Sequence, residues 1–234
     1  MIKNIFIFVG GRGTRLGKLT QRTPKPLLLF NRRPFLDYLL KGISALKPKK
    51  IYLLCFYKSE QFFKKYHLKK ISNTQIICIK EAQALGTAGS LFNAKKYIEN
   101  QTLVCNGDTF FDYDFEKFNK INLKKKPMHM FCISNHNYKS NKKLSNLSIQ
   151  KEKIKFKRKS NIMNSGIYII NKNIRKFINK NNYSLEDEII PNLINNDEII
   201  AKKIELYSLD IGIIKNYKKF LTISKKIKLS FRLI

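Results

Sequence analysis

IFIFVGGRGTRLGKLTQRTPKPL, residues 5–27, places a short apolar run directly before a glycine-rich and strongly cationic segment. The apolar run at residues 5–9 has the length and composition of a buried strand. Glycine then occurs at positions 10, 11 and 13. A backbone without Cβ atoms can approach a ligand closely, and the prolines on either side of Lys25 restrict the chain around that cation. A turn alone needs none of these features, so the stretch predicts a strand followed by a ligand-binding loop.

Apolar runs of strand length recur along the first part of the chain, at residues 5–9, 51–56, 75–79, 102–106 and 128–134. Helical periodicity fills the intervals between the first four runs, at residues 34–46, 59–70 and 87–98. Pro34 is expected at the first position of its helix, and Ser59 and Thr87 are expected to cap theirs. This alternation predicts parallel strands joined by crossover helices, with ligand sites beyond the carboxyl ends of the strands.

The pattern changes after residue 134. Residues 135–146 are polar and predict a loop, residues 147–157 a hairpin, residues 164–171 a strand and residues 203–212 a final strand and turn. A helix is expected to start within residues 183–194, with Ser184 as its cap and Asp187 in the capping-box position. The second part of the chain therefore predicts a small β-rich layer.

The formal net charge of +31, taken alone, suggests nucleic acid or an anionic membrane as a partner. Its distribution argues against that, because lysines are spread over the whole chain together with Asn and Ile. Such a pattern is expected where an A/T-rich genome places Lys and Asn on solvated faces. The densest cationic stretch, residues 151–159, has Phe156 as its one aromatic residue, whereas nucleic-acid platforms interleave several. We therefore expect no specific nucleic acid partner.

The four cysteines, at positions 55, 78, 105 and 132, lie inside apolar stretches, where free Cys behaves as a small hydrophobe. Their spacing matches neither a zinc site nor a redox pair, which predicts reduced thiols. The longest apolar runs are of strand length, and only Lys3 precedes the first one, so neither a secretion signal nor a membrane span is indicated. We expect a cytoplasmic protein without a membrane partner.

Two common glycine-rich loops do not fit residues 10–17. The dinucleotide fingerprint needs a third glycine where this chain has Leu16, and the P-loop needs a glycine where it has Arg12. What fits is a loop for a triphosphate whose pyrophosphate leaves. The glycine amides can meet a base and phosphate oxygens, while Arg15 supplies fixed and Lys25 mobile positive charge.

GGRGTRLGKLTQRTPKPLL, residues 10–28, resembles the signature of the sugar-1-phosphate nucleotidyltransferases, G-G-x-G-T-R-L followed about ten residues later by P-K-P. Further segments are similar to the other motifs of that family, in the family's order: EAQALGTAGSL (81–91), NGDTFFD (106–112), NSGIYIIN (164–171), YSLEDEIIP (183–191) and DIG (210–212). The resemblance spans residues 1–220, and the motifs are highly specific as a set.

Within the family, PKPL, RPFLDYLL, LGTAGS and NGDTFFD look most like the D-glycero-α-D-manno-heptose 1-phosphate guanylyltransferases. The N-acetylmuramate 1-phosphate uridylyltransferases and mannose 1-phosphate guanylyltransferases share fewer of these details. Three departures stand out: Phe8-Val9 replaces Leu-Ala, KSNKKLSN at residues 139–146 replaces an Arg-Tyr-Gly loop, and Arg158-Lys159 replaces a Glu-Lys pair. The last two fall on the sugar side of the family's site.

The resemblance implies an α/β fold with a Rossmann-like, mostly parallel sheet and crossover helices, of the GT-A-like nucleotidyltransferase type, plus a small β-rich sugar-binding layer. It implies one domain over residues 1–234, in which residues 1–127 mainly bind nucleotide and residues 128–220 mainly bind the sugar phosphate, with 221–234 as a tail. The implied reaction moves a nucleotidyl group from an NTP, with GTP favoured, to a sugar 1-phosphate and releases pyrophosphate. The product would be a nucleotide sugar for surface glycan synthesis.

No general base is expected, because a sugar 1-phosphate has a second pKa of about 6 and is already mostly dianionic at neutral pH. The reaction instead needs charge neutralisation. Asp108 and Asp210, each at a strand end beside a glycine, are suited to hold one Mg²⁺ together with substrate oxygens. Arg15 and Lys25 would stabilise the transferring and leaving phosphoryl groups. Asp112 and Asp114 fit ordinary turn and cap positions better.

The resemblance also assigns binding residues. On the nucleotide side they are Gly10, Gly11, Gly13, Thr14, Glu81, Gly86 and Thr87. Guanine presents two adjacent donors that the carboxylate of Glu81 can accept. On the sugar side they are Asn164, Gly166, Glu186 and Lys159. Glu186 could equally be a carboxylate favoured by a helix N-terminus. A non-catalytic nucleotide or nucleic-acid binder is the alternative from a different class.

Overall fold

The computed structural model describes residues 1–121, 126–134, 145–157 and 159–227, and the chain divides into two compact units. Unit 1 combines Met1–Ala84, Asn106–Lys120 and Tyr207–Ile234, and unit 2 combines Leu85–Cys105 and Ile121–Leu206. The predicted functional halves, 1–127 and 128–220, divide the chain differently and stay a prediction. Most of the predicted polar loop at 135–146 lies outside the described residues.

Unit 1 contains the predicted parallel sheet. Its strands are β1 (Asn4–Phe8), β4 (Lys50–Cys55), β6 (Thr74–Lys80) and the short β5 (Lys70–Ile71). β4 pairs in parallel with β1 on one side and with β6 on the other, while β5 is antiparallel to β6. Ile5, Ile51 and Ile76 are opposite one another in this register and fully buried, as expected for strands covered on both faces. Parallel pairing is therefore confirmed for the predicted strands at residues 5–9, 51–56 and 75–79.

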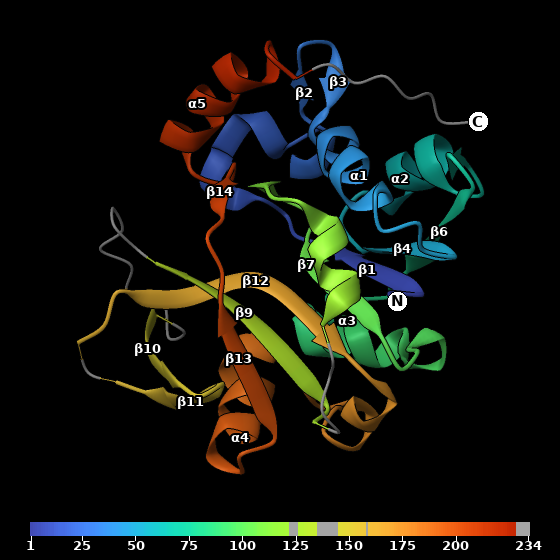
Figure 1. Ribbon diagram of the computed structural model, residues 1–234. Helices are drawn as coiled ribbons and strands as arrows, with labels where there is room; N and C mark the ends of the chain where they lie inside the picture. Colours follow the sequence, from blue (N-terminus) through green and yellow to red (C-terminus); the bar gives the residue numbers. More distant parts are fainter. Residues whose placement is uncertain (122–125, 135–144, 158, 228–234) are drawn as a thin grey trace. The chain divides into compact units, whose positions relative to one another are not determined.

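Two crossover helices connect these strands, α1 (Phe35–Ser44) between β1 and β4 and α2 (Ser59–Tyr66) between β4 and β6. α1 buries an apolar stripe with helical spacing, formed by Leu36, Leu39, Leu40 and Ile43. α2 packs against β4 and β6, and Figure 1 shows it at the same end of unit 1 as these strands. The predicted helix at 59–70 is shorter than expected, because Lys70–Ile71 pairs with β6 instead.

The three predicted helix starts were wrong in detail. Pro34 is the N-cap of α1 and ends the short strand β3 (Arg33–Pro34), so it is not the first helical residue. Lys58, with φ 49° in the left-handed region, precedes α2 and makes Ser59 its first residue. α3 (Gly86–Asn93) begins one residue before Thr87, whose hydroxyl bonds outside the helix, and a separate 3₁₀ turn, η3 (Lys95–Tyr97), follows it.

The rest of unit 1 surrounds an aromatic cluster. Its elements are η1 (Thr14–Thr20), η2 (Lys25–Leu27), β2 (Leu29–Phe30) with β3, β8 (Thr109–Asp112) with β14 (Tyr207–Asp210), η4 (Phe115–Lys120) and α5 (Ile214–Ser224). Phe220 of α5 lies with its ring centroid 4.9 Å from Phe30 and 5.0 Å from Phe35. Figure 1 shows α5 beside β2 and β3. α5 includes the first residues of the segment predicted as a tail.

Unit 2 is built mainly from antiparallel strands: β7 (Thr102–Asn106), β9 (Met128–Ser134), β10 (Ser145–Gln150), β11 (Lys153–Phe156), β12 (Ile162–Ile170) and β13 (Ile199–Lys203). β12 pairs with β7, β9 and β10, and β13 is parallel to β9. β9 and β12 lie side by side in Figure 1. The predicted hairpin is confirmed, since β10 and β11 meet at Lys151 and Glu152, both with positive φ.

The helical elements of unit 2 after β12 are η5 (Lys172–Lys176), the π-helical turn η6 (Leu185–Ile189) and α4 (Ile190–Asn195). Ser184 caps η6 as predicted, because its hydroxyl accepts the Asp187 N–H at 3.0 Å. The returning carboxylate of the expected capping box is Glu188, which accepts the Ser184 N–H at 3.2 Å, and not Asp187.

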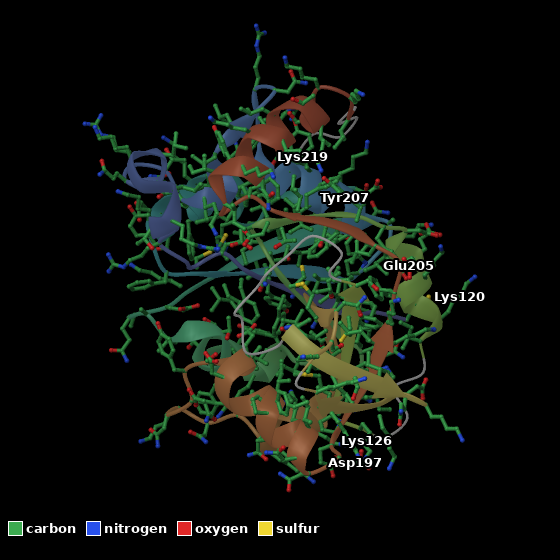
Figure 2. The ribbon with its side chains drawn as sticks, turned by 90° about the vertical axis from the view of Figure 1, so that its left-hand side faces the viewer. Lys120, Lys126, Asp197, Glu205, Tyr207 and Lys219 are labelled. Carbon is green, nitrogen blue, oxygen red and sulfur yellow. The ribbon has the colours of Figure 1, made fainter. Side chains whose placement is uncertain are left out.

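Surface contacts link neighbouring elements within each unit, and the residues of two of these contacts are labelled in Figure 2. In unit 1 the Lys219 ammonium lies 5.0 Å from the ring centroid of Tyr207. In unit 2 the Lys126 ammonium donates to the carbonyl of Asp197. Exposed contacts of this kind contribute little to stability, which therefore depends on the buried side chains.

The cysteines are buried and free, as predicted for small hydrophobes. Burial raises the pKa of Cys132 to about 12, so this thiol is unreactive near neutral pH. In the part of the chain that the structure describes, no helix is both long and apolar enough to cross a lipid bilayer.

One buried acid makes the stability of unit 1 depend on pH. Asp37 of α1 is 3% exposed, accepts a hydrogen bond of 2.7 Å from the Tyr66 hydroxyl and lies 3.9 Å from the Arg33 guanidinium. Burial raises the pKa of Asp37, and the Tyr66 hydrogen bond with the charges of Lys65 and Arg33 only partly opposes it. The folded protein therefore binds this proton more tightly than the unfolded chain does.

Asp37→Asn should therefore raise the free energy of unfolding relative to the native chain by an amount that grows with pH. The native protein has its full stability below the pKa of the unfolded state and loses part of it as pH rises through the higher folded pKa. Asparagine keeps an acceptor for Tyr66 and carries no charge. Urea unfolding between about pH 4 and pH 7 measures the difference. Asp112→Asn, which replaces an exposed acid of the same unit, is the control. If the free energy of unfolding of Asp37→Asn and that of the native protein changed in parallel with pH, the assignment to Asp37 would be contradicted.

Candidate active site

The glycine-rich loop, residues 10–21, begins directly after β1. Gly13 has φ 67°, in the left-handed region that favours glycine, and its carbonyl accepts the Thr20 hydroxyl at 2.9 Å. This bond folds the loop back on itself and leaves Thr14 exposed at the start of η1. Around Gly11, nothing in the described residues lies within 4 Å of the place a Cβ would take. The loop therefore presents accessible backbone where the sequence predicted nucleotide binding.

Two ion pairs lie next to this loop. Lys25, whose side chain is 8% exposed, donates from Nζ to Oδ2 of Asp108. Arg15, whose side chain is 54% exposed, lies with Nη2 3.3 Å from Oδ2 of Asp210. We call these four residues the charged cluster. The structure thus brings together the two cations and the two carboxylates that the sequence predicted for catalysis and metal binding.

The two carboxylates meet because β8 and β14 pair. Thr109 is opposite Asp210 in this antiparallel ladder, and the Ile211 N–H donates to the carbonyl of Asp108 at 3.0 Å. Thr109 also donates from its hydroxyl to Oδ1 of Asp108 at 3.3 Å. Both aspartates therefore lie at the same end of the two-stranded sheet formed by β8 and β14. Pro24 and Pro26, which flank Lys25, restrict the backbone of η2 and so help to position the Lys25 side chain.

The electrostatics of the cluster keep Asp108 ionised. Burial alone would raise the pKa of Asp108, but the charge and hydrogen bond of Lys25, the hydrogen bond of Thr109 and the charge of Arg15 outweigh it. The pKa of Asp108 therefore lies below its ordinary value. An anionic carboxylate with free lone pairs is a suitable ligand for a hard cation.

Gly212 is a site residue that sequence reasoning missed. A Cβ on Gly212 would lie 2.7 Å from Lys25 Nζ, 2.8 Å from Asp210 Oδ1 and 2.9 Å from Arg15 Nη2. The Gly212 N–H donates to Asp210 Oδ1 at 2.7 Å, which fixes that carboxylate. The only signal in the sequence was its position two residues after Asp210, within the motif DIG. All three charged groups pack against a residue that has no side chain.

The cluster has the donor types that Mg²⁺ prefers. Mg²⁺ is usually held by one or two carboxylates, and substrate phosphates and water complete its coordination. Asp108 and Asp210 supply two such carboxylates in adjacent turns. Within the described ranges, no group of three or more His, Cys, Asp or Glu side chains is arranged to hold a metal. The residues therefore fit an ion shared with a phosphate substrate better than a site made of protein ligands alone.

Glu81 follows the carboxyl end of β6. Its side chain is buried, and its N–H donates to the carbonyl of Cys55 at 2.9 Å, which ties it to the end of β4. Gly10 leaves β1 at the same edge of the sheet, where a Cβ would lie 3.1 Å from Phe56. Parallel strands thus place both predicted nucleotide-side residues at one sheet edge, as this architecture requires.

A second group of predicted residues lies in unit 2. Glu186 accepts a hydrogen bond from the Thr87 hydroxyl at 2.7 Å and one from the Tyr168 hydroxyl at 3.2 Å. Asn164 donates to the Tyr168 hydroxyl at 2.5 Å. Thr87 was predicted to bind the nucleotide, and the structure places it with Glu186 and Asn164, which were predicted to bind the sugar phosphate. We call Thr87, Asn164, Tyr168 and Glu186 the polar network.

Local backbone geometry supports the polar network. Between Asn164 and Ile167, β12 departs from regular pairing with β9, and such a bulge redirects a side chain. Asn164 accepts the Gly166 N–H at 2.9 Å, and Gly166 has φ 78°. Position 86 also requires glycine, because a Cβ there would lie 2.1 Å from the carbonyl oxygen of Tyr183.

Tyr168 is the second residue that sequence reasoning missed. It is fully buried within an apolar strand, and burial with the nearby charge of Glu186 raises its pKa well above the ordinary value. Its hydroxyl therefore remains a donor to Glu186. The signal in the sequence was one polar hydroxyl within the otherwise apolar run after Gly166.

Not every predicted sugar-side residue joins the network. Lys159 has an exposed side chain and, among the described residues, makes no hydrogen bond or ion pair with Asn164 or Glu186. Arg158 and most of the segment 139–146, where the chain departs from the family pattern, lie outside the described residues. The sugar-side assignment of Lys159 stays a prediction.

Comparison with known proteins agrees with this geometry. The family model described as nucleotidyl transferase matches residues 4–226. A D-glycero-alpha-D-manno-heptose 1-phosphate guanylyltransferase of Campylobacter jejuni is 32% identical over 221 residues, which cover 92% of this chain and 97% of that protein. A mannose-1-phosphate guanyltransferase of Schizosaccharomyces pombe is 30% identical over 90% of this chain and 61% of that longer protein.

Solved structures give the same picture. The crystal structure of HddC from Yersinia pseudotuberculosis complexed with GMP-PN has a TM-score of 0.74 at 27% identity and covers 95% of this chain and 99% of that chain. A UDP-glucose pyrophosphorylase from Acinetobacter baumannii has a TM-score of 0.79 at 15% identity and covers 94% of this chain and 92% of that chain. The second likeness concerns the fold alone.

Gly212→Ala should lower kcat roughly ten- to hundredfold, because the new methyl group forces the charged cluster apart. Its stability should change little, since the atoms it would meet are the mobile ends of Lys25, Arg15 and Asp210. Steady-state kinetics and thermal unfolding test the two parts of the prediction. Gly11→Ala, whose Cβ would meet open space, controls for the effect of the exchange itself on stability. Native-like turnover by Gly212→Ala would show that the packing of the cluster is unimportant.

Proposed function

Because this chain belongs to the nucleotidyl transferase family, we propose that it is the member that transfers a guanylyl group from GTP to D-glycero-α-D-manno-heptose 1-phosphate. The enzyme class, sugar-1-phosphate nucleotidyltransferase, is shared by the relatives. The choice of GTP and heptose rests on the guanylyltransferase relative that matches almost its whole length.

The charged cluster is the observation that carries the proposal. In the reaction, an oxygen of the sugar phosphate forms a bond to the α-phosphorus of the nucleotide as the bond to the β-phosphate oxygen breaks, and pyrophosphate leaves. Two anions must approach and a third must depart, so the main requirement is positive charge of fixed geometry. Arg15 and Lys25 supply that charge beside the glycine-rich loop of the same unit.

The acceptor needs no protein base, because its phosphate is already mostly dianionic at neutral pH. No histidine has to be part of the charged cluster for this chemistry. Asp108 and Asp210 would hold Mg²⁺, which neutralises phosphate charge when it is bound. In the protein without substrate, these carboxylates hold Lys25 and Arg15 in position. The same residues therefore keep the cations ordered before phosphate oxygens take over as their partners.

Glu81 supports GTP as the nucleotide. Guanine carries two adjacent N–H donors, and a buried carboxylate is a strong acceptor for both. A base without that donor pair would form neither of these two hydrogen bonds, at a cost of a few kcal/mol. HddC from Yersinia pseudotuberculosis, which is 27% identical to this chain, has been solved in complex with GMP-PN, and this agrees with a guanine nucleotide.

The polar network supports a sugar as the acceptor. The Thr87 and Tyr168 hydroxyls hold the two oxygens of Glu186, and each oxygen keeps a second lone pair for a sugar hydroxyl. We assign Asn164, Gly166 and Glu186 to the sugar phosphate on this basis, with Lys159 as the predicted cation. The product, a GDP-heptose, would serve cell-surface polysaccharide synthesis from the cytoplasm.

The proposal is tested by incubating the protein and Mg²⁺ with each of GTP, UTP, CTP and ATP, and with heptose, mannose, glucose and N-acetylmuramate 1-phosphates. We expect the highest kcat/KM, measured by pyrophosphate release, for GTP with the heptose. Preference for mannose or for UTP would assign the chain to the corresponding relatives within the family. Binding of nucleotide without any pyrophosphate release would instead indicate a non-catalytic nucleotide binder.

Asp108→Asn and Asp210→Asn should each lower kcat by about a hundredfold or more, since both carboxylates would hold the metal. Only Asp108→Asn should also lower stability, by roughly 1–3 kcal/mol, because it leaves the buried Lys25 ammonium without a charged partner. Asp210→Asn leaves Arg15, which is half exposed to water. Turnover at several Mg²⁺ concentrations and urea unfolding measure the two effects. With Asp112→Asn as control, normal turnover of either variant at limiting Mg²⁺ would refute the assignment.

A further inference from the structure

Tyr57 contacts both ends of the glycine-rich loop. The residue lies just after β4, and its backbone N–H donates to the carbonyl of Gly10 at 3.2 Å. Its hydroxyl lies 3.0 Å from the carbonyl oxygen of Thr20 and 2.8 Å from that of Gln21. One residue just beyond the end of β4 thus joins the first residue of the loop to its last two.

The side chain of Tyr57 is suited to this contact. A phenol carries one donor at the end of a rigid ring, and here that donor is shared between two neighbouring carbonyl oxygens. The Arg12 guanidinium also lies 5.8 Å from the centroid of the Tyr57 ring, within the range of a cation–π contact. The same side chain therefore contacts the loop at its beginning, through Arg12, and at its end.

Neighbouring residues strengthen the contact. Gln61, which lies on α2, donates from Nε2 to the carbonyl of Arg22 at 2.9 Å. Lys58, between β4 and α2, has φ 49°, a left-handed conformation that reverses the chain directly after Tyr57. The strand end and the first turn of α2 thus form one surface that receives the carbonyl groups of residues 20–22.

The loop has its own internal bonds, but these do not connect it to the sheet. The Thr20 hydroxyl lies 2.9 Å from the carbonyl oxygen of Gly13 and 3.2 Å from that of Gly17, and the Leu16 N–H donates to Gly13 at 3.0 Å. These bonds shape the loop interior. Tyr57 sets where that shaped loop stands relative to β4.

We propose that Tyr57 is a positioning residue that fixes the glycine-rich loop to the sheet edge and so holds its amides and Arg15 ready for the nucleotide. The inference rests on the proposed function for its ligand. Its physical basis is that a loop ordered before binding loses less conformational entropy when the nucleotide binds. The Tyr57 hydroxyl should therefore affect nucleotide binding more than the sugar phosphate or the chemical step.

Tyr57→Phe is the test, because phenylalanine keeps the ring under Arg12 and removes the donor alone. Tyr38→Phe is the matched control, since its hydroxyl also donates to one backbone carbonyl of unit 1, that of Phe30, at 2.7 Å. Loop order is measured by limited trypsin digestion of the ligand-free protein, with cleavage mapped at Arg12, Arg15 and Lys18. We expect cleavage there several-fold faster in Tyr57→Phe than in the native protein or in Tyr38→Phe, with cleavage elsewhere unchanged.

Kinetics supply the second readout. KM for GTP should rise about three- to tenfold in Tyr57→Phe, the effect of one lost hydrogen bond, while KM for the sugar 1-phosphate and kcat stay within about twofold. Native loop cleavage together with a native KM for GTP would overturn the inference. Uniformly faster cleavage at all sites would also overturn it, because it would show a general loss of stability.

The two proposals fail separately. If the native protein releases no pyrophosphate with any nucleotide and sugar, the proposed function is wrong, and GTP·Mg²⁺ binding measured by calorimetry replaces the kinetic readout. A Tyr57→Phe variant with the native dissociation constant and native loop cleavage would then overturn the positioning role. Faster loop cleavage with a weaker dissociation constant would support that role without any catalysis.

Discussion

The pairing of β8 with β14 is the constraint on which the candidate active site depends. It brings Asp210 to Asp108, and it brings a carboxylate to Arg15, a residue 195 positions away in the chain. The same segment packs Leu209 and Ile211 into the aromatic cluster around Phe220. The segment that buries Leu209 and Ile211 therefore also brings Asp210 into the charged cluster. A chain that failed to place β14 would leave the Arg15 guanidinium without the carboxylate of Asp210.

Under the proposed function, the charged cluster would be a site for three anions that is formed before any of them binds. Two cations held close together would repel each other, and the two aspartates offset that repulsion through short, specific contacts. The low pKa of Asp108 keeps its charge in place over the physiological range. Phosphate oxygens would then replace carboxylate oxygens around the same cations, so that substrate binding would need little reorganisation.

Sequence alone predicted the features that depend on local pattern. The parallel strands followed from apolar runs, and the members of the charged cluster followed from motifs read in order. It missed what depends on contacts between distant segments: Gly212 is needed because Lys25 and Arg15 come close to it, and Tyr168 matters because Glu186 and Asn164 meet its hydroxyl. The cap expected at Ser59 failed for a related reason, since the chain reversal after β4 uses Lys58 instead.

Under the proposed function, the two units would divide the chemistry in a way that accounts for the departures from the family pattern. The charged cluster and the glycine-rich loop belong to unit 1, while the polar network belongs to unit 2. Phosphoryl transfer makes the same demand whatever the sugar, so the unit 1 motifs are almost unchanged. Sugar recognition depends on hydroxyl positions that differ among substrates, and the departures at 139–146 and 158–159 fall within unit 2. Under the proposed function, substrate choice would therefore change through unit 2 while the charges of the charged cluster in unit 1 are preserved.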